Sequence, residues 1–220
     1  RQVKLRTGSL SQGGKYIGRF GKKASVYNLL QQTADALSQD MGISTLYNPI
    51  DVFSGQELDP ELPTQKVNNL GFYLQTLKAP VPRNQDEPVV AQGKALFVQV
   101  NCASCHKPQL TTGNAPVPAL AFKTFYPYTD LLLHDLGAEL DDGYTEGSAK
   151  TSEWRTPPLW GLGLSPRSQG GKYFLMHDGR AGSIEQAIEM HGGEAAASRQ
   201  RYRSLSTGDK EALIKFLKSL

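Results

Sequence analysis

The sequence predicts a mostly α-helical protein in which long loops join the helices. Apolar residues recur at intervals of three and four in several separate stretches, as they do in helices with one buried face. In contrast, residues 107–168 are rich in proline, threonine, glycine and aromatic residues and show little periodicity, which predicts long structured loops. The chain has 220 residues, of which 39% are apolar, and this is enough for a hydrophobic core.

Charge and hydropathy argue against two classes of partner. The 24 basic and 21 acidic residues leave a formal net charge of +3, which does not favour nucleic acid. No apolar run approaches the roughly 18 residues that a membrane-spanning helix needs. We therefore expect neither nucleic-acid binding nor a membrane span.

The N-terminal part, residues 1–85, is expected to form a smaller helical segment. Residues 1–23 carry seven basic and no acidic side chains among scattered glycines, which predicts an irregular cationic lead-in: a docking arm, a solvated loop or a strand packed on another domain. A helix is expected over residues 26–41, with Gly42 as its stop. A second is expected over residues 67–77, before Pro80 and Pro82. We interpret this segment as the remainder or linker of an upstream domain.

The second predicted domain covers residues 86–220. Its first helix opens at Asp86 and Pro88 and leads into a pair of cysteines. A short helix begins at Ser183, where Gln186 completes a capping-box pattern, and it ends before Gly192 and Gly193. The last helix begins near Ser206 or Thr207 and runs to the C-terminus.

The motif Cys102-Ala-Ser-Cys105-His106 follows the first helix of this domain, and it contains the only two cysteines of the chain. Its spacing places both thiols on one side of a helical turn, where each can form a thioether to a vinyl group of haem. The imidazole of His106 then lies under the iron as an axial ligand. We therefore expect one covalently attached haem c.

A thiol-disulfide pair is the competing interpretation of the two cysteines. Such a pair usually stands at a strand-to-helix turn in a βαβ context and does not require the following histidine. No such context is visible in the sequence. Because haem is attached to such motifs outside the cytoplasm, and Arg1 does not open a signal peptide, we expect a trimmed product with sequence missing upstream.

The second axial ligand must come from His134, His177, His191 or a methionine. On the short helix that begins at Ser183, His191 follows Ile184, Ala187 and Ile188 on one face, so its side chain projects from the buried stripe. Met190 lies about 100° around the helix and is the weaker candidate. We predict that His191 binds the iron opposite His106.

Three further residues are candidates to contact the cofactor. His177 precedes an Asp-Gly turn, where the adjacent carboxylate can fix its tautomer, and we favour a supporting role. His134 either has a similar supporting role or is a buried histidine that forms a hydrogen bond with the backbone. Arg155 can pair with a haem propionate through its planar guanidinium or form a surface salt bridge.

Taken in order, seven segments resemble the di-haem oxidoreductase family, which is related to the bacterial di-haem cytochrome c peroxidases. They are GRFG at 18–21, DMGI at 40–43, CASCH at 102–106, YTDLLLHDLG at 128–137, EWRTPPLWGLG at 153–163, MHDGRAGSIEQAI at 176–188 and HGGEA at 191–195. The resemblance covers nearly the whole chain, and its specificity lies in the ordered series.

The resemblance implies a mostly helical fold with a C-terminal cytochrome c-like domain, and export to the bacterial periplasm. In many related peroxidases a methionine at the position of His191 binds the second iron, so the histidine here implies bis-histidine ligation and a lower potential. The sequence departs from the family in two places. It has a single CxxCH motif where the family has two, and Lys22 stands where we expect an aromatic residue.

Two functions follow from these observations. In the first, the chain is the electron-transfer domain of a periplasmic di-haem peroxidase-like oxidoreductase and works with a redox partner protein, while an upstream haem domain reacts with peroxide. In the second, favoured by the single motif, the chain is a stand-alone mono-haem electron carrier.

Overall fold

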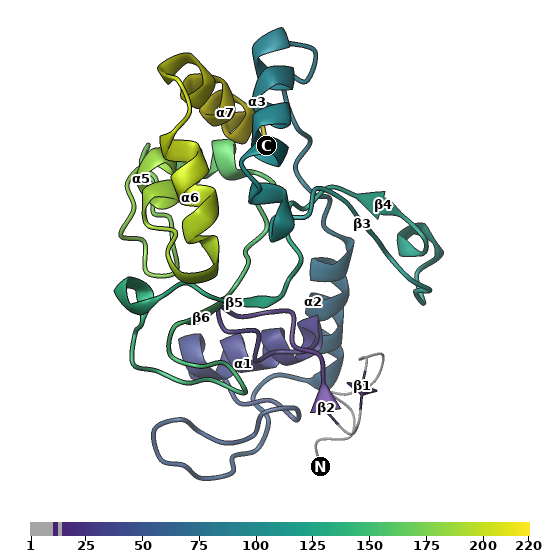
Figure 1. Cartoon of the computed structure of the whole chain (residues 1–220). Helices are drawn as coiled ribbons and strands as arrows, with labels where there is room; N and C mark the ends of the chain where they lie inside the picture. Colours follow the sequence, from purple (N-terminus) through teal and green to yellow (C-terminus); the bar gives the residue numbers. More distant parts are fainter. Residues whose placement is uncertain (1–10, 13–14) are drawn as a thin grey trace. The chain divides into compact units, whose positions relative to one another are not determined.

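Helices dominate the secondary structure in the computed structural model, which describes residues 11–12 and 15–220 (Figure 1). The expectation of a mostly helical chain is confirmed. The chain divides into two compact units, Arg1–Lys78 and Ala79–Leu220. In the described residues, no helix is long and apolar enough to cross a membrane.

The first unit is built on two helices that pack together, α1 (Leu29–Met41) and α2 (Thr64–Thr76). The side chain of Asn28 accepts a hydrogen bond from the Gln31 amide and caps α1, and Gly42 ends it in the left-handed conformation. The helix begins three residues later than predicted, because Val26 pairs with Phe20 in a β-bridge. The buried apolar residues of the pair include Ala34, Leu37 and Val67.

The lead-in is only partly covered by the structure. Its residues 1–10 and 13–14 lie outside the described part, so the expectation of an irregular cationic segment is not tested there. The strands β1 (Ser11–Gln12) and β2 (Lys15–Tyr16) pair antiparallel. These four residues are more regular than expected, whereas residues 17–23 are irregular apart from a bridge at Phe20, as expected.

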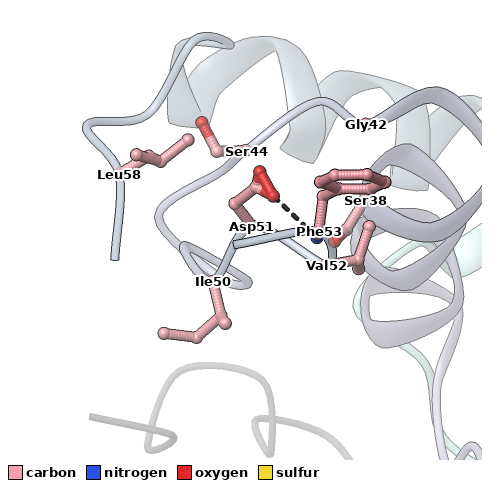
Figure 2. Close-up of a pocket in the computed structure, with 8 residues that line it drawn as sticks. All are labelled: Ser38, Gly42, Ser44, Ile50, Asp51, Val52, Phe53 and Leu58. Atoms are coloured by element: carbon pink, nitrogen blue, oxygen red, sulfur yellow. Dashed lines mark hydrogen bonds between the residues drawn. The ribbon is translucent and has the colours of Figure 1, made fainter. Parts of the chain in front are cut away.

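A depression of about 220 Å³ lies beside α1 (Figure 2). Its lining consists of Ser38, Gly42, Ser44, Ile50, Asp51, Val52, Phe53 and Leu58. The Asp51 carboxylate accepts hydrogen bonds from the amides of Phe53 and Ser54, and these bonds lower the pKa of this exposed group. No nitrogen or sulfur side chain lines the depression, so it offers no axial ligand to a haem.

In the second unit, α3 (Pro88–Gln99) packs along α7 (Thr207–Ser219), and the two helices lie side by side (Figure 1). Gly93 makes the close approach possible, because a Cβ there would overlap the Ala212 carbonyl and come within 2.6 Å of the Phe216 Cβ. Phe97, Leu213 and Phe216 form the centre of the hydrophobic core.

Three shorter helices complete the helical part of this unit: α4 (Ser165–Ser168), α5 (Ile184–Glu189) and α6 (Ala196–Arg203). Ser183 and Ser206 cap α5 and α7, as predicted, by accepting bonds from Gln186 and Asp209 amides. The Gln186 side chain accepts from the Gly182 amide, so the capping box is shifted by one residue.

The predicted loop region, residues 107–168, contains two short antiparallel pairs that the sequence did not indicate. Strand β3 (Leu110–Thr111) pairs with β4 (Thr124–Phe125), and β5 (Leu133–Asp135) pairs with β6 (Glu153–Arg155). Long irregular connections join them, as expected. In the second pair His134 lies opposite Trp154, and both side chains therefore project from the same face.

The segment before α3 belongs to the second unit. The Arg83 amide donates to the Ser219 carbonyl at 2.8 Å, and the Gln85 side-chain amide donates to the Ser219 hydroxyl at 3.1 Å. These bonds attach residues 79–85 to the end of α7. The sequence-based domain boundary between residues 85 and 86 stays a prediction.

Candidate functional site

The two cysteines stand at the end of α3, in a turn that reverses the chain. Asn101 ends the helix in the left-handed conformation (φ 70°), and the 3₁₀-turn Cys102–Ser104 follows. The His106 amide donates to the Cys102 carbonyl at 3.0 Å. Cys102 packs against the hydrophobic core, so the motif is anchored to the α3–α7 pair.

The His106 ring is held by a backbone carbonyl. Its Nδ1 lies 3.0 Å from the Tyr128 carbonyl oxygen, which can only accept a hydrogen bond. The proton is therefore on Nδ1, and Nε2 keeps the lone pair that a metal needs. Burial, with a smaller contribution from His191, lowers the pKa of His106 to about 4, so the imidazole is neutral.

Tyr128 presents its carbonyl from an unusual backbone conformation. Its φ of 55° lies in the left-handed region, which costs a non-glycine residue of the order of 1 kcal/mol. Its ring packs edge-on against Phe97 and Phe216 in the core. The core thus fixes Tyr128 in the conformation that directs its carbonyl to His106.

His191 stands two residues beyond the end of α5. Its Nδ1 lies 2.7 Å from the Ala187 carbonyl oxygen, one helical turn earlier. By the same acceptor argument the proton is on Nδ1 and the lone pair is on Nε2. The ring is partly accessible at the surface, yet it is deep enough that burial lowers its pKa.

The two imidazoles lie at a distance that suits a metal between them. Their ring centroids are 6.5 Å apart, and the ring planes make an angle of 50°. Imidazole nitrogen binds a metal at about 2 Å and lies about 1.1 Å from its ring centre, so two opposed imidazoles have centroids about 6.2 Å apart. The observed spacing fits one ion bound by both rings, and the donor set suits haem iron.

The environment of the thiols does not favour redox chemistry between them. Burial raises the pKa of Cys102 to about 11 and also raises the pKa of Cys105. A redox C-x-x-C motif instead depends on a thiol whose pKa is lowered. The surroundings of the motif therefore argue against a thiol-disulfide protein.

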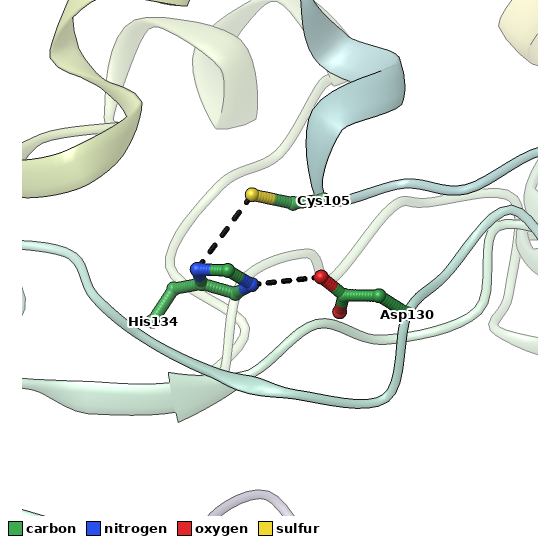
Figure 3. A group of neighbouring side chains, drawn as sticks. All are labelled: Cys105, Asp130 and His134. Carbon is green, nitrogen blue, oxygen red and sulfur yellow. Dashed lines mark hydrogen bonds and ion pairs between the residues drawn. The ribbon is translucent and has the colours of Figure 1, made fainter.

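His134 lies between Cys105 and Asp130 (Figure 3), and it also contacts the Glu194 carboxylate. Its Nε2 is 2.9 Å from an Asp130 oxygen, its Nδ1 is 2.8 Å from a Glu194 oxygen, and the Cys105 sulfur is 3.7 Å from Nδ1. Burial lowers the pKa of His134, but the hydrogen bonds and charges of the two carboxylates outweigh it and raise the pKa. Since both partners accept, the imidazolium form satisfies both contacts.

Cys105, Asp130 and His134 lie close enough together to be considered as ligands for a separate metal ion. Hydrogen bonds to carboxylates already occupy both ring nitrogens of His134. A metal would have to break one of these charge-assisted bonds, which are among the stronger ones in proteins. We therefore interpret the group as a hydrogen-bonded network.

The other two sequence candidates stand on or near β6. His177 stacks on Trp154, with ring centroids 3.4 Å apart and planes 12° apart, so it packs against a buried aromatic side chain. Arg155 lies opposite Leu133 in the strand pair and projects from the face opposite to that of His134. Burial lowers its pKa. Their contact with a cofactor stays a prediction.

Sequence reasoning missed three residues that hold the candidate ligands. Tyr128 binds His106 through its backbone, and Asp130 and Glu194 bind His134. The Tyr128 contact uses a backbone carbonyl, which every residue has, so the amino-acid sequence does not indicate it. The two carboxylates are 64 residues apart in the printed numbering, and only the fold brings them to one imidazole.

Comparison with known proteins places this geometry in context. The profile of the family described as "Di-haem oxidoreductase, putative peroxidase" matches residues 12–220. No curated protein matches the sequence. Among solved structures, the chain is similar to hydrazine synthase of Kuenenia stuttgartiensis under xenon pressure, with 19% identity and a TM-score of 0.43. The match covers 78% of this chain and 59% of the length of that one.

Proposed function

Since the chain belongs to the di-haem oxidoreductase family, we propose that it is the c-type haem electron-transfer domain of a periplasmic, peroxidase-like oxidoreductase. In this proposal residues 86–220 form a cytochrome c-like domain that holds one covalent haem. Cys102 and Cys105 provide the thioether bonds, and His106 and His191 are the axial ligands.

The single observation that carries this proposal is the 6.5 Å spacing of the two histidine rings. Each ring has its Nδ1 proton committed to a backbone carbonyl, and each keeps Nε2 available. The two histidines are 85 positions apart in the sequence, so local structure does not explain why their rings lie close together.

Each side chain has a defined task in this site. The bound haem supplies one-electron iron chemistry. The thiols would hold the haem covalently, and the two histidines would both bind its iron, which would leave no position for a substrate. Two imidazoles also favour a lower potential than a histidine and a methionine. The geometry supports electron transfer in preference to chemistry on peroxide.

The description of the family implies a second haem. The family is described as di-haem, whereas the printed sequence has one CxxCH motif. We propose that reaction with peroxide takes place at a haem outside these 220 residues, in an upstream domain, and that a redox partner protein supplies the electrons. The periplasmic location rests on the motif, since its haem is attached outside the cytoplasm.

Replacing His191 tests the ligand assignment. In the haem-loaded chain, His191→Ala should keep covalent haem but convert it from low-spin to high-spin and allow it to bind added imidazole. Met190→Ala, next to it, is the matched control and should stay low-spin. An unchanged low-spin spectrum in His191→Ala, or a high-spin spectrum in Met190→Ala, would refute the assignment.

The single motif favours one alternative, a stand-alone mono-haem electron carrier. Counting the haems of the complete gene product separates the two functions. A second CxxCH with its haem supports the oxidoreductase, and a single haem with no reaction toward peroxide supports the carrier.

A further inference from the structure

Two backbone segments hold the candidate ligands, and a chain of hydrogen bonds joins them. The first ligand segment, residues 128–130, binds His106 through the Tyr128 carbonyl. The second ligand segment, residues 191–195, begins with His191. We call the three side chains that connect these segments, Asp130, His134 and Glu194, the carboxylate bridge.

The first ligand segment is firmly anchored. The Thr129 amide donates to the Lys107 carbonyl at 3.0 Å, directly after the motif, and the Thr129 hydroxyl donates to the Thr156 carbonyl at 2.6 Å. Thr129 is buried. The Asp130 carboxylate, which accepts from His134, therefore starts the bridge from a fixed position.

The second ligand segment leads from α5 through a 3₁₀-turn, Gly193–Ala195, into α6. The helix α5 ends at Glu189, and His191 is followed by Gly192 and Gly193, whose backbones lose the most conformational freedom on ordering. Gly193 has a φ of 49°, in the left-handed region. A side-chain bond to a neighbouring strand therefore acts as a tether for this glycine-containing segment.

Glu194 provides that tether by binding β5 twice. One carboxylate oxygen accepts from His134 at 2.8 Å, and the other accepts from the Asp135 amide at 3.1 Å. The three glycines 137, 192 and 193 allow the backbones to meet: a Cβ on Gly192 would come within 2.6 Å of the Leu136 carbonyl, and one on Gly193 would overlap the Asp135 carbonyl. The Glu194 carboxylate thus adds two hydrogen bonds to a close backbone contact that side chains larger than glycine would block.

We propose that the carboxylate bridge sets the spacing of the two axial histidines and that Glu194 is the positioning residue for His191. The Cys105 sulfur lies 3.7 Å from Nδ1 of His134, so the bridge runs beside one of the two cysteines proposed to bind the haem. Because it depends on these ligands, the inference rests on the proposed function.

The test compares how readily an added ligand replaces His191 in the haem-loaded full chain. Carbon monoxide can bind ferrous iron only after His191 leaves, so its binding rate reports how firmly the histidine is held. Glu194→Gln keeps the size of the side chain but removes its charge, so its contact with His134 is no longer a charge-assisted hydrogen bond. We expect carbon monoxide to bind about tenfold faster, as expected for the loss of one charge-assisted hydrogen bond.

Glu87→Gln is the matched control. It removes the charge from an exposed ion pair with Lys215 in the same unit, and it should bind carbon monoxide at the wild-type rate. Asp130→Asn breaks the other end of the bridge and should act in the same direction as Glu194→Gln. The double variant should bind carbon monoxide no faster than the faster of the two single variants, because each single substitution already interrupts the same bridge.

The outcomes separate the bridge from the haem assignment. If wild-type protein is low-spin and His191→Ala opens the iron, but both bridge variants match Glu87→Gln, the bridge is refuted and the proposed function stands. If the wild-type protein carries no covalent haem, or is already high-spin, the proposed function itself is refuted. Glu194 is more than half exposed, so Glu194→Gln should lower the thermal midpoint by only a few degrees, roughly 2–4 °C per kcal/mol lost.

Discussion

At the scale of single residues, burial and hydrogen-bond partners together give chemically identical histidines different states. Burial lowers the pKa of His106 and His191 and outweighs the opposing effect of the carbonyl that each Nδ1 contacts, so both rings are neutral. His134 faces two carboxylates, and its pKa is raised. Neutral imidazole can bind a metal, so this difference supports the proposed ligand roles of His106 and His191.

The cysteines give the first prediction at this scale. Replacing both Cys102 and Cys105 by Ser should abolish covalent haem, because no other thiol in the chain can form a thioether. The haem should then separate from the polypeptide in a denaturing gel, whereas wild-type chain should keep it. Two titratable thiols and no haem absorption in the wild type would instead favour a thiol-disulfide protein.

At the scale of secondary-structure elements, the contact of α3 with α7 determines where the motif stands. Because α3 leads directly into Cys102, a displaced helix would displace the cysteines. The two helices approach through Gly93, which lies against the backbone of α7. Packing of this kind tolerates no added volume without a shift of one helix.

Gly93→Val should therefore destabilise the protein by about 3 kcal/mol, which lowers the thermal midpoint by roughly 6–12 °C in a protein of this size. Gly208→Ala is the control, since nothing lies within 4 Å of a Cβ at that position of α7. It should change the unfolding free energy by less than about 1 kcal/mol. Equal midpoints for the two variants would contradict the packing account.

The short helix α5 depends on its cap more than the longer helices do. Ser183→Ala removes the bond to the Gln186 amide and should cost about 1 kcal/mol of unfolding free energy, measured by denaturant unfolding. Ser168→Ala, which loses only an exposed bond to the Ser165 carbonyl, is the matched control and should be nearly neutral. A larger loss in Ser168→Ala would contradict the assignment of the cap.

Several elements could be predicted from the sequence because they carry periodic apolar residues and clear caps. The helices α1, α2, α3, α5 and α7 were predicted from apolar residues at helical spacing. The caps at Ser183 and Ser206 use ordinary side-chain bonds, while α3 begins at Pro88 without a side-chain cap. Helix α6 was missed because arginines dominate it and Tyr202 is its one buried residue. Strands β3 to β6 were missed because two or three residues are too few to show an alternating pattern.

The candidate site likewise contains residues that the sequence indicates and contacts that it does not. The motif and His106 could be proposed from local spacing. His191 was proposed from a helical face, although α5 ends at Glu189 and the histidine lies in the turn beyond it. The contacts of His134 with Asp130 and Glu194 join three distant segments, and the support of His106 comes from the Tyr128 backbone. Such contacts depend on tertiary structure and not on any local pattern.

At the scale of the whole molecule, the site belongs to one unit. The residues 102, 105, 106, 134 and 191, together with the main hydrophobic core, all lie within Ala79–Leu220. We predict that residues 79–220 alone fold, retain covalent haem and give the low-spin spectrum of the full chain. Loss of the haem from this fragment, with retention in the full chain, would show that the first unit contributes to the site.

The central claim is that His106 and His191 bind one iron from opposite sides, and electron paramagnetic resonance of the ferric haem-loaded chain tests it most directly. The account predicts a low-spin signal of bis-histidine type and no high-spin signal. A high-spin signal, or the optical signature of a methionine ligand, would contradict it.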